Sequence, residues 1–384
     1  MSHNLRVNFI SNLDIDETSG GWTGINAAIY QQLSSHFNTK YIGPINPPTD
    51  YPAKLVSKVR RMSGGSGSFH FFSKHRLKRI AKLVKLAADE TAPCNFFHGS
   101  TPWILYDSAR PYFLYADTCF STYVDVYHDR AKFLPADLQR ISDSEARWLA
   151  RATRVFFGTQ WAMEKAVADY RIPRTNLSVV GAGGSMTPPT KDTYAGGLDL
   201  LFVALDFERK GGRICAEAFL KVRQQLPEAR LTIVGEQPPA DVLRVPGISY
   251  AGLLRKSMPA ELGRLSTLYS KAFALIHPTC SDIQPLVISE AGYFGCPTIA
   301  PRSFGIPELI NDGVTGFLLE LPLTADAFAN RILDLARDRQ KYLAMRSAAR
   351  TNAIANQTWP AVGERIVEEM TAALSAKSSI SAQP

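Results

Sequence analysis

Short apolar runs alternate with longer segments of helical apolar spacing along the first half of the chain. An apolar run at 6–10 precedes a glycine-containing loop, and the segment 25–35 has the spacing of a helix. Further runs that we predict as strands lie at 39–42, 94–97, 111–115 and 154–157, and further helical segments lie at 142–150 and 160–170. Alternation of this kind is typical of a parallel sheet with helices on both faces.

The alternation breaks at the glycine-rich segment 181–184 and restarts after it. Pro188, Pro189 and the pair Gly196 and Gly197 follow the break, so we place a domain linker there. Beyond it we predict strands at 198–204, 229–234, 248–251, 273–277 and 298–300, and helices at 214–225, 261–270 and 285–294. The pattern predicts an α/β protein of two doubly wound domains, 1–183 and 184–359, with a ligand bound in the deep cleft between them.

The composition is that of a globular protein with reduced cysteines. Apolar residues make up 45% of the chain and charged residues 20%. No apolar run approaches the roughly 20 residues that span a membrane, and the start lacks the apolar stretch of a secretory leader. The five cysteines are scattered, without a C-x-x-C pair. We therefore expect a cytoplasmic protein without a disulfide or zinc framework.

The net charge of +8 is concentrated in a basic segment, 54–85, which holds ten lysines and arginines and no acidic residue. Within it we predict a flexible loop at 62–68 and a basic amphipathic helix at 74–86. A solvated basic face is one interpretation. The other is a patch that holds an anionic acceptor or the anionic inner face of a membrane, to which the protein would bind peripherally. Nucleic acid is disfavoured, because no aromatic residues are interleaved with the charges.

The most informative stretch runs from His277 to Leu319. A strand ends at His277, a loop carries Asp282, and a helix begins near Pro285 with Glu290 in its second turn. Free backbone amides at such a helix start can bind a diphosphate; those expected here belong to Gln284, Leu286 and Val287. Glu290 would face the cleft and accept hydrogen bonds from ribose hydroxyls, and Asp282 would lie beside the transferred sugar.

This stretch resembles the retaining GT-B glycosyltransferases of family 4, in which an acidic pair spaced E-x7-E is followed by G-x-P and G-x-x-G-x-L. Here the pair is Asp282 and Glu290, and 305–308 and 312–318 continue the pattern. The chain departs from the family in its aspartate and in Gln284-Pro285. The resemblance implies a fold of two Rossmann-like domains, an acceptor-binding one at 1–183 and a donor-binding one at 184–359, with a C-terminal helix at about 360–384 completing the first.

A second motif, 200–212, is similar to the family's R-x4-K-G element. Lys210 takes the place of its lysine, and Arg209 could replace the charge of the usual arginine, whose position holds Leu205. We expect Lys210 to neutralise a leaving diphosphate, and Gly211 to let the backbone approach it. A plain basic turn before a helix is the alternative. We expect backbone groups near Gly252 and Leu253 to contact the base.

Four candidates lie in the first domain. The resemblance implies that a loop containing Gly20, Gly21 and Trp22 closes over the donor phosphate and the acceptor. Asp117, just after a strand, could orient the acceptor hydroxyl or take its proton, or it could be a helix N-cap. His98 also ends a strand, although a lone histidine is more often structural. The D-x-D at 14–16 is interpreted as an ordinary loop pair and not as a metal site.

Together these features predict a metal-independent enzyme without cofactor. It would move a sugar from a nucleotide-diphosphate sugar to a glycan or lipid-linked acceptor, in polysaccharide or glycoconjugate biosynthesis. No carboxylate is placed as a covalent nucleophile, so we favour same-face attack and retention of configuration. The alternatives are a catalytically silent sugar-nucleotide-binding subunit and a nucleotide-sugar epimerase on the same fold. A phosphorylase and an NAD-dependent dehydrogenase are disfavoured, since no pyridoxal lysine and no dinucleotide fingerprint are present.

Overall fold

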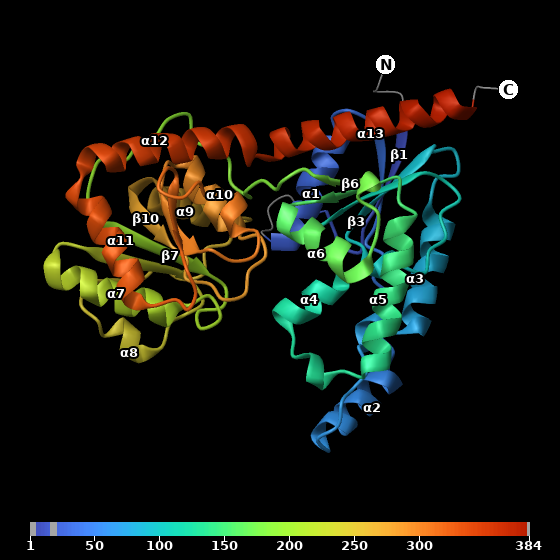
Figure 1. Ribbon diagram of the computed structural model, residues 1–384, viewed down its shortest axis with the longest axis horizontal. Helices are drawn as coiled ribbons and strands as arrows, with labels where there is room; N and C mark the ends of the chain where they lie inside the picture. The colour runs from blue at the N-terminus through green and yellow to red at the C-terminus, as the bar shows by residue number, and fades with distance from the viewer. Residues whose placement is uncertain (1–4, 16–20, 382–384) are drawn as a thin grey trace. The chain divides into compact units, whose positions relative to one another are not determined.

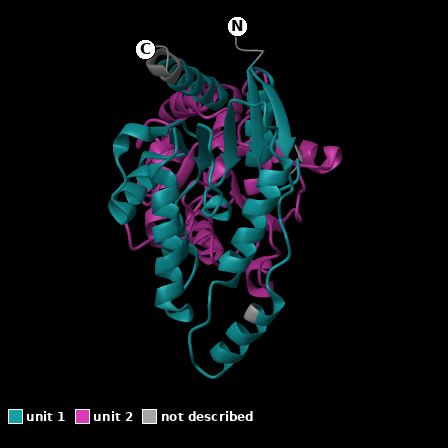
Figure 2. Cartoon of the chain, turned by 90° about the vertical axis from the view of Figure 1, so that its right-hand side faces the viewer, with its two compact units in different colours: residues 1–16, 25–181, 362–384 teal, residues 17–24, 182–361 magenta. Residues whose placement is uncertain are grey.

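The computed structural model describes residues 5–15 and 21–381 (Figure 1). The chain divides into two compact units (Figure 2). Unit 1 comprises residues 1–16, 25–181 and 362–384, and unit 2 comprises residues 17–24 and 182–361. No helix in the described part of the chain is both long and apolar enough to cross a membrane.

Unit 1 is built on a six-stranded parallel sheet of order β2-β1-β3-β4-β5-β6. Its strands are β1 (Arg6–Ile10), β2 (Asn38–Ile42), β3 (Cys94–His98), β4 (Tyr112–Ala116), β5 (Arg154–Phe157) and β6 (Leu177–Val179). Its helices are α1 (Gly21–Ser34, whose first turn belongs to unit 2), α2 (Tyr51–Met62), α3 (Lys74–Ala87), α4 (Phe120–Tyr127), α5 (Pro135–Ala150) and α6 (Gln160–Tyr170). Short 3-10 turns lie at η2 (His70–Phe72), η3 (Thr101–Trp103), η4 (Arg130–Lys132) and η5 (Arg174–Asn176). Every residue of the central strands β3 and β4 is buried, because both faces of the sheet are covered.

Unit 2 repeats the architecture with a parallel sheet of order β12-β11-β10-β7-β8-β9. The strands are β7 (Asp199–Ala204), β8 (Arg230–Gly235), β9 (Ile248–Tyr250), β10 (Ala272–Ile276), β11 (Thr298–Pro301) and β12 (Gly316–Leu319). The helices are α7 (Gly212–Gln225), α8 (Ala240–Leu243), α9 (Pro259–Lys271), α10 (Leu286–Tyr293), α11 (Ala325–Arg337) and α12 (Arg339–Asn356), with a 3-10 turn η6 (Ile306–Glu308). The last helix, α13 (Trp359–Ser381), begins in unit 2 and continues into unit 1.

The predicted strands and helices are present, with ends that differ by up to seven residues, the largest difference being at the start of α5. The α/β class with two doubly wound sheets is confirmed. The chain passes between the units at 16–17, 24–25, 181–182 and 361–362. We did not predict the helices α2, α4, α8, α11 and α12 or the edge strands β6 and β12. The predicted loop at 62–68 is held by backbone hydrogen bonds from Gly67 N to Lys132 O (3.0 Å) and from Leu134 N to Gly67 O (2.8 Å).

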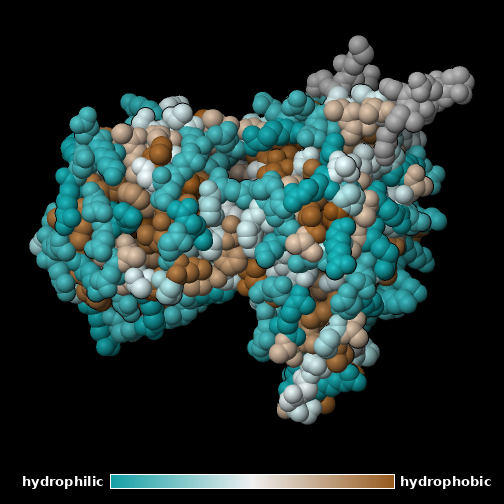
Figure 3. Space-filling view, viewed as in Figure 1, coloured by the Kyte–Doolittle hydropathy of each residue, from teal (hydrophilic) through white to brown (hydrophobic). Residues whose placement is uncertain are grey.

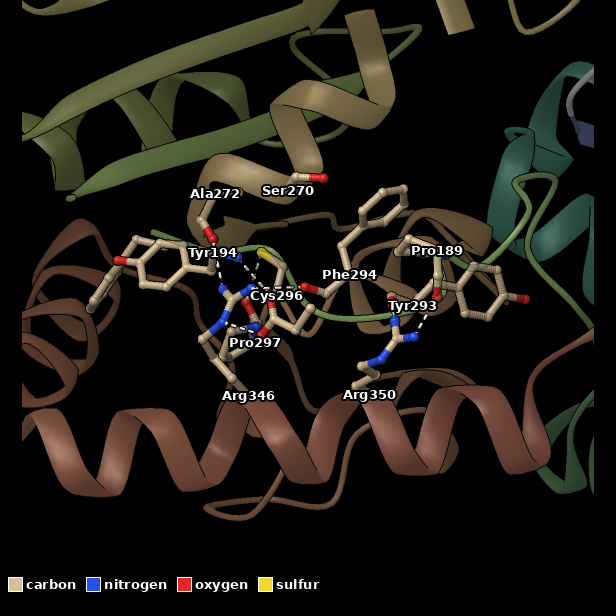
Figure 4. Close-up of polar contacts among 12 residues, drawn as sticks. Pro189, Tyr194, Ser270, Ala272, Tyr293, Phe294, Cys296, Pro297, Arg346 and Arg350 are labelled. Carbon is tan, nitrogen blue, oxygen red and sulfur yellow. Dashed lines mark hydrogen bonds and ion pairs between the residues drawn. The ribbon is translucent and has the colours of Figure 1, made fainter. Parts of the chain in front are cut away.

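An arginine of α12 fastens the linker to the end of α10 in unit 2 (Figure 4). The guanidinium of Arg346 is buried and donates to both carboxylate oxygens of Asp192, at 2.9 and 2.7 Å. It also donates to the carbonyls of Ala272 (2.9 Å) and Phe294 (2.7 Å). The planar fork of an arginine can serve several acceptors at once. One side chain thereby fixes the linker, the start of β10 and the end of α10, which carries Glu290.

Candidate active site

Lys210 and Asp282 form an ion pair at the carboxyl edge of the unit 2 sheet. Lys210 lies in the turn between β7 and α7, and Asp282 lies in the loop between β10 and α10. Because β7 and β10 are neighbouring parallel strands, their following loops meet at one edge. Lys210 Nζ donates to Asp282 Oδ2 at 2.6 Å and to the carbonyl of Ser281 at 2.9 Å. The fold thus joins the two sequence motifs that we singled out.

His277, directly after β10, is a third member of this cluster. Its Nε2 lies 3.5 Å from Asp282 Oδ2, and the imidazole is almost fully buried. Burial by itself raises the pKa of the Asp282 carboxyl, but His277 and Lys210 outweigh it and hold that pKa below its ordinary value. Asp282 is therefore ionised at neutral pH. In the sequence we named His277 only as the end of a strand. Its position directly before the loop of Asp282 was the signal that it could contact that carboxylate.

Gly211, next to Lys210, allows the loop after β7 to pack closely against the loop after β10. Gly211 has a positive φ of 78°, and a Cβ there would lie 2.1 Å from the carbonyl oxygen of Pro278. Only glycine fits this position. The space beside Gly211 is therefore taken by protein, and the predicted approach of its backbone to a diphosphate is not what requires the glycine. Arg209 pairs with Asp206 in its own turn, with Nε 2.9 Å from Oδ2.

The start of α10 lies next to this pair. Pro285 is the N-cap, one position before the helix, and Leu286 and Val287 form the first turn. The first N–H groups of a helix have no acceptor within it, so those of Leu286 and Val287 are able to bind an anion. Gln284 is half-buried in the preceding loop.

Glu290 is enclosed, contrary to our expectation that it faces an open cleft. The carboxylate is fully buried. Its Oε1 accepts from the backbone N–H of Ser185 at 2.9 Å and from Lys256 Nζ, and its Oε2 accepts from the hydroxyl of Tyr269 at 3.3 Å. The sequence pattern did not show that the linker, the loop of Lys256 and helix α9 cover this position. Lys256 thus occupies Oε1 of this carboxylate.

Lys256 comes from the loop that also carries Gly252 and Leu253. Gly252 has a φ of 86° with open space where a side chain would begin, and Leu253 is half-exposed. Arg255 fixes the loop to Glu261 by an ion pair of 2.6 Å, which lowers the pKa of that glutamate to about 2. The segment predicted to contact the base therefore supplies the cation on Glu290.

In unit 1, Asp117 follows β4 directly and is half-buried. The alternative that it caps a helix is wrong, because the N-cap of α4 is Cys119. His98 is fully buried at the end of β3, where burial lowers its pKa to about 3 and keeps the imidazole neutral. Gly20 and Asp16 lie outside the described residues. Gly21 and Trp22 form the first turn of α1.

Sequence reasoning missed a buried carboxylate beneath these unit 1 loops. Glu145 of α5 is fully buried and accepts four hydrogen bonds. Its Oε1 accepts from the hydroxyls of Ser100 (2.6 Å) and Thr101 (2.7 Å). Its Oε2 accepts from the N–H of Phe120 (2.6 Å) and the hydroxyl of Tyr170 (2.6 Å). Glu145 thus ties the loop after His98 to the loop after Asp117. A polar residue among the apolar positions of a helix was its only signal.

Residues 190–352 match the family model described as glycosyl transferases group 1. This segment includes both motifs of the unit 2 site. The match covers less than half of the chain.

Curated relatives match part of the chain. A GDP-mannose-dependent alpha-(1-6)-phosphatidylinositol monomannoside mannosyltransferase of Mycolicibacterium smegmatis is 30% identical over 169 residues, 42% of this chain and 44% of the relative. A D-inositol 3-phosphate glycosyltransferase of Arthrobacter is 27% identical over 204 residues, 49% of this chain and 48% of the relative. The match thus spans less than half of each of these relatives.

Solved structures extend the likeness to both units. Sucrose-phosphate synthase of Thermosynechococcus elongatus has a TM-score of 0.70 and 16% identity, covering 97% of this chain and 100% of that one. Anabaena HepE in complex with UDP has a TM-score of 0.65 and 15% identity, covering 96% and 100%. These likenesses confirm the two-domain, Rossmann-like GT-B fold around the group 1 glycosyltransferase segment.

Proposed function

We propose that the protein is a glycosyltransferase that moves a sugar from a nucleotide-diphosphate sugar to a glycan or lipid-linked acceptor. Retention of configuration and independence of a metal are part of the proposal. The ion pair of Lys210 with Asp282, beside the first turn of α10, is the observation that carries it. A cation and free helix N–H groups next to a carboxylate suit a leaving diphosphate and a sugar hydroxyl, respectively.

In the proposed reaction, unit 2 binds the donor. Lys210 and the N–H groups of Leu286 and Val287 stabilise the diphosphate as its bond to the sugar C1 breaks. Asp282 accepts a hydrogen bond from the sugar, and His277 holds Asp282 in place. Glu290 binds the ribose once Lys256 has moved. Arg209 adds positive charge near the diphosphate.

Unit 1 binds the acceptor in this proposal. The acceptor oxygen forms the new bond to C1 on the face that the diphosphate leaves, and Asp117 orients the acceptor hydroxyl or receives its proton. The segment of Gly21 and Trp22, at the start of α1, closes over the donor phosphate. The basic segment 54–85 holds an anionic membrane surface that presents a lipid-linked acceptor.

A thermal-shift screen against UDP-, GDP-, ADP- and CMP-sugars, each with and without EDTA, tests the donor site. We expect one nucleotide class to raise the melting temperature equally in both conditions. A ligand at one hundred times its Kd stabilises the fold by about 2.7 kcal/mol. Lys210→Ala should abolish the shift, whereas Lys221→Ala, which removes only a surface pair with Asp326, should keep it.

Turnover separates an enzyme from a silent binding subunit. Asp282→Asn should retain the donor-induced thermal shift but lose sugar transfer, measured as released nucleoside diphosphate. A wild-type protein that binds a donor and releases no nucleoside diphosphate with any acceptor or water would identify a silent subunit. A shift that disappears with EDTA would refute metal independence.

A further inference from the structure

The helix α2 exposes its apolar face to solvent, whereas an ordinary surface helix buries that face. At about 100° per residue, Tyr51, Leu55, Val56, Val59 and Met62 occupy one arc about 140° wide. All five side chains are exposed, Met62 by 79% and Val59 by 58%. A surface helix normally buries its apolar stripe. Here the apolar stripe faces solvent.

The side of α2 that faces the protein is marked by Ser57, which lies opposite the apolar arc. Ser57 is buried, and its hydroxyl lies 2.7 Å from that of Ser68. It also accepts from the N–H of Ser68 at 3.1 Å. At the base of the excursion, Asp50 binds Ser73 and His75, which joins the start of α2 to the start of α3. Figures 1 and 2 show the helix projecting from the lower end of unit 1.

The neighbouring helix α3 is an ordinary basic surface helix. It buries Leu77, Ile80 and Val84 and exposes its lysines. Arg76, which we had counted with the basic segment, is buried and donates to the carbonyls of Pro47 and Phe71 at 2.9 Å. The sequence singled out α3 as the amphipathic basic element, but its apolar face is already used by the core.

The charges around the apolar arc of α2 favour one occupant. Lys54, Lys58, Arg60 and Arg61 are all exposed, and α2 contains no acidic residue. A two-fold contact with a second copy would bring α2 against α2 and set these like charges opposite one another. An anionic lipid surface satisfies both features, since it attracts the bases and accepts the apolar side chains below its head groups. With 12 residues, α2 is too short to span a bilayer and would lie in its surface.

We propose that α2 inserts its apolar face into an anionic membrane surface and anchors unit 1 there. The inference names the element that carries the membrane partner of the proposed function, and it depends on that function only for the acceptor that the membrane presents. Figure 3 shows brown and beige atoms among teal ones on this protrusion, as expected for an apolar face rimmed by charge.

Co-flotation of the full chain with vesicles tests the proposal. We expect binding to phosphatidylcholine vesicles that contain about one third phosphatidylglycerol, and none to phosphatidylcholine alone. The variant Leu55→Ser/Val59→Ser/Met62→Ser should bind more than tenfold more weakly. The variant Lys54→Gln/Lys58→Gln/Arg60→Gln should lose about fivefold per charge. The control, Lys78→Gln/Lys82→Gln/Lys85→Gln on α3, should lose far less than the α2 charge variant.

All these side chains are exposed, so each variant should keep the wild-type melting temperature and donor-induced shift. Absence of binding to anionic vesicles, wild-type binding by the apolar variant, or an equal loss in the α3 control would overturn the proposal. If light scattering shows a dimer that dissociates only in the α2 variants, the apolar face is assigned to a contact with a second copy. Selective capture of acidic peptides instead of vesicles would assign it to a protein partner. Vesicle binding without any donor-induced shift would refute the proposed function and leave the anchor intact.

Discussion

Glu145 in unit 1 and Glu290 in unit 2 are both fully buried carboxylates, but they are satisfied in different ways. Glu145 accepts hydrogen bonds from three hydroxyls and one backbone N–H. Glu290 accepts from Lys256, one backbone N–H and one more distant hydroxyl. The partners of Glu145 belong to packed elements, whereas the lysine on Glu290 comes from a loop and keeps 17% of its side chain exposed.

The difference indicates what each carboxylate can do. Four short hydrogen bonds leave Glu145 no capacity for a ligand, so it positions the loops after β3 and β4. Glu290 has one partner on a long, flexible side chain that a ligand could displace. A buried acid with neutral, fixed donors is thus structural here, and a buried acid with a movable cation is available for binding.

Removing Glu145 should have the largest effect on stability. Glu145→Ala leaves four buried donors without an acceptor, and we expect the free energy of unfolding of unit 1 to fall by about 4 kcal/mol. Urea unfolding with a probe in each unit measures this loss. Glu164→Ala, which removes a surface ion pair with Arg174, should cost far less, because both groups are exposed to solvent. A loss below 1 kcal/mol for Glu145→Ala would show that the four contacts are not cooperative.

Compared with the removal of Glu145, the removal of Glu290 should reduce stability somewhat less but should reduce donor affinity more. Glu290→Ala leaves Lys256 without its partner, and we expect a loss of about 3 kcal/mol in unit 2. The donor-induced thermal shift should also disappear, because the ribose loses its acceptor. Lys256→Met should also cost stability, because it leaves the buried Glu290 carboxylate without its cation. It should nevertheless raise donor affinity, since the ligand no longer competes with a lysine. Weaker donor binding by Lys256→Met would contradict displacement, and Glu217→Ala on the exposed face of α7 is the control.

Acid should weaken unit 1 through His98, which precedes the loop held by Glu145. The unfolded imidazole titrates near pH 6.5, whereas the folded one has a pKa of about 3. The unfolded state therefore binds more protons, and stability falls as the pH drops from 6.5 towards 3. Between pH 6.5 and pH 5 we expect a loss of roughly 1.5 kcal/mol from this group. His98→Gln should remove that part of the pH dependence; an unchanged slope would argue against a neutral buried imidazole.

The smallest effects should come from the two tyrosines that donate to these glutamates. The hydroxyl of Tyr170 lies 2.6 Å from Glu145 and also accepts from the N–H of Ser121. That of Tyr269 lies 3.3 Å from Glu290. Tyr170→Phe should cost about 1.5 kcal/mol and Tyr269→Phe about 0.5 kcal/mol. Thermal unfolding of the two variants measures these losses. A larger loss for Tyr269→Phe than for Tyr170→Phe would contradict the prediction that Glu145 has the stronger tyrosine contact.

Much of the architecture could be predicted because it is written in local patterns. Buried parallel strands such as β3 and β10 are continuous apolar runs, and the linker is marked by glycines and prolines. The segment of 277–319 also identified the group 1 family from its motif spacing. We missed the edge strands β6 and β12 and the helices α2, α4, α8, α11 and α12. The strands are short, with three and four residues, and α2 lacks the buried face that its pattern normally indicates.

The sequence alone determined the two α/β sheets, the linker and the residue types of the candidate site in unit 2, because periodicity, turn residues and motif spacing are local properties of the chain. Tertiary structure decided which of those residues meet. The adjacency of β7 and β10 brings Lys210 to Asp282, and packing encloses Glu290 with Lys256 and Glu145 with four donors. Such pairings join residues far apart in the chain, so their geometry depends on strand order and packing, which no local pattern records.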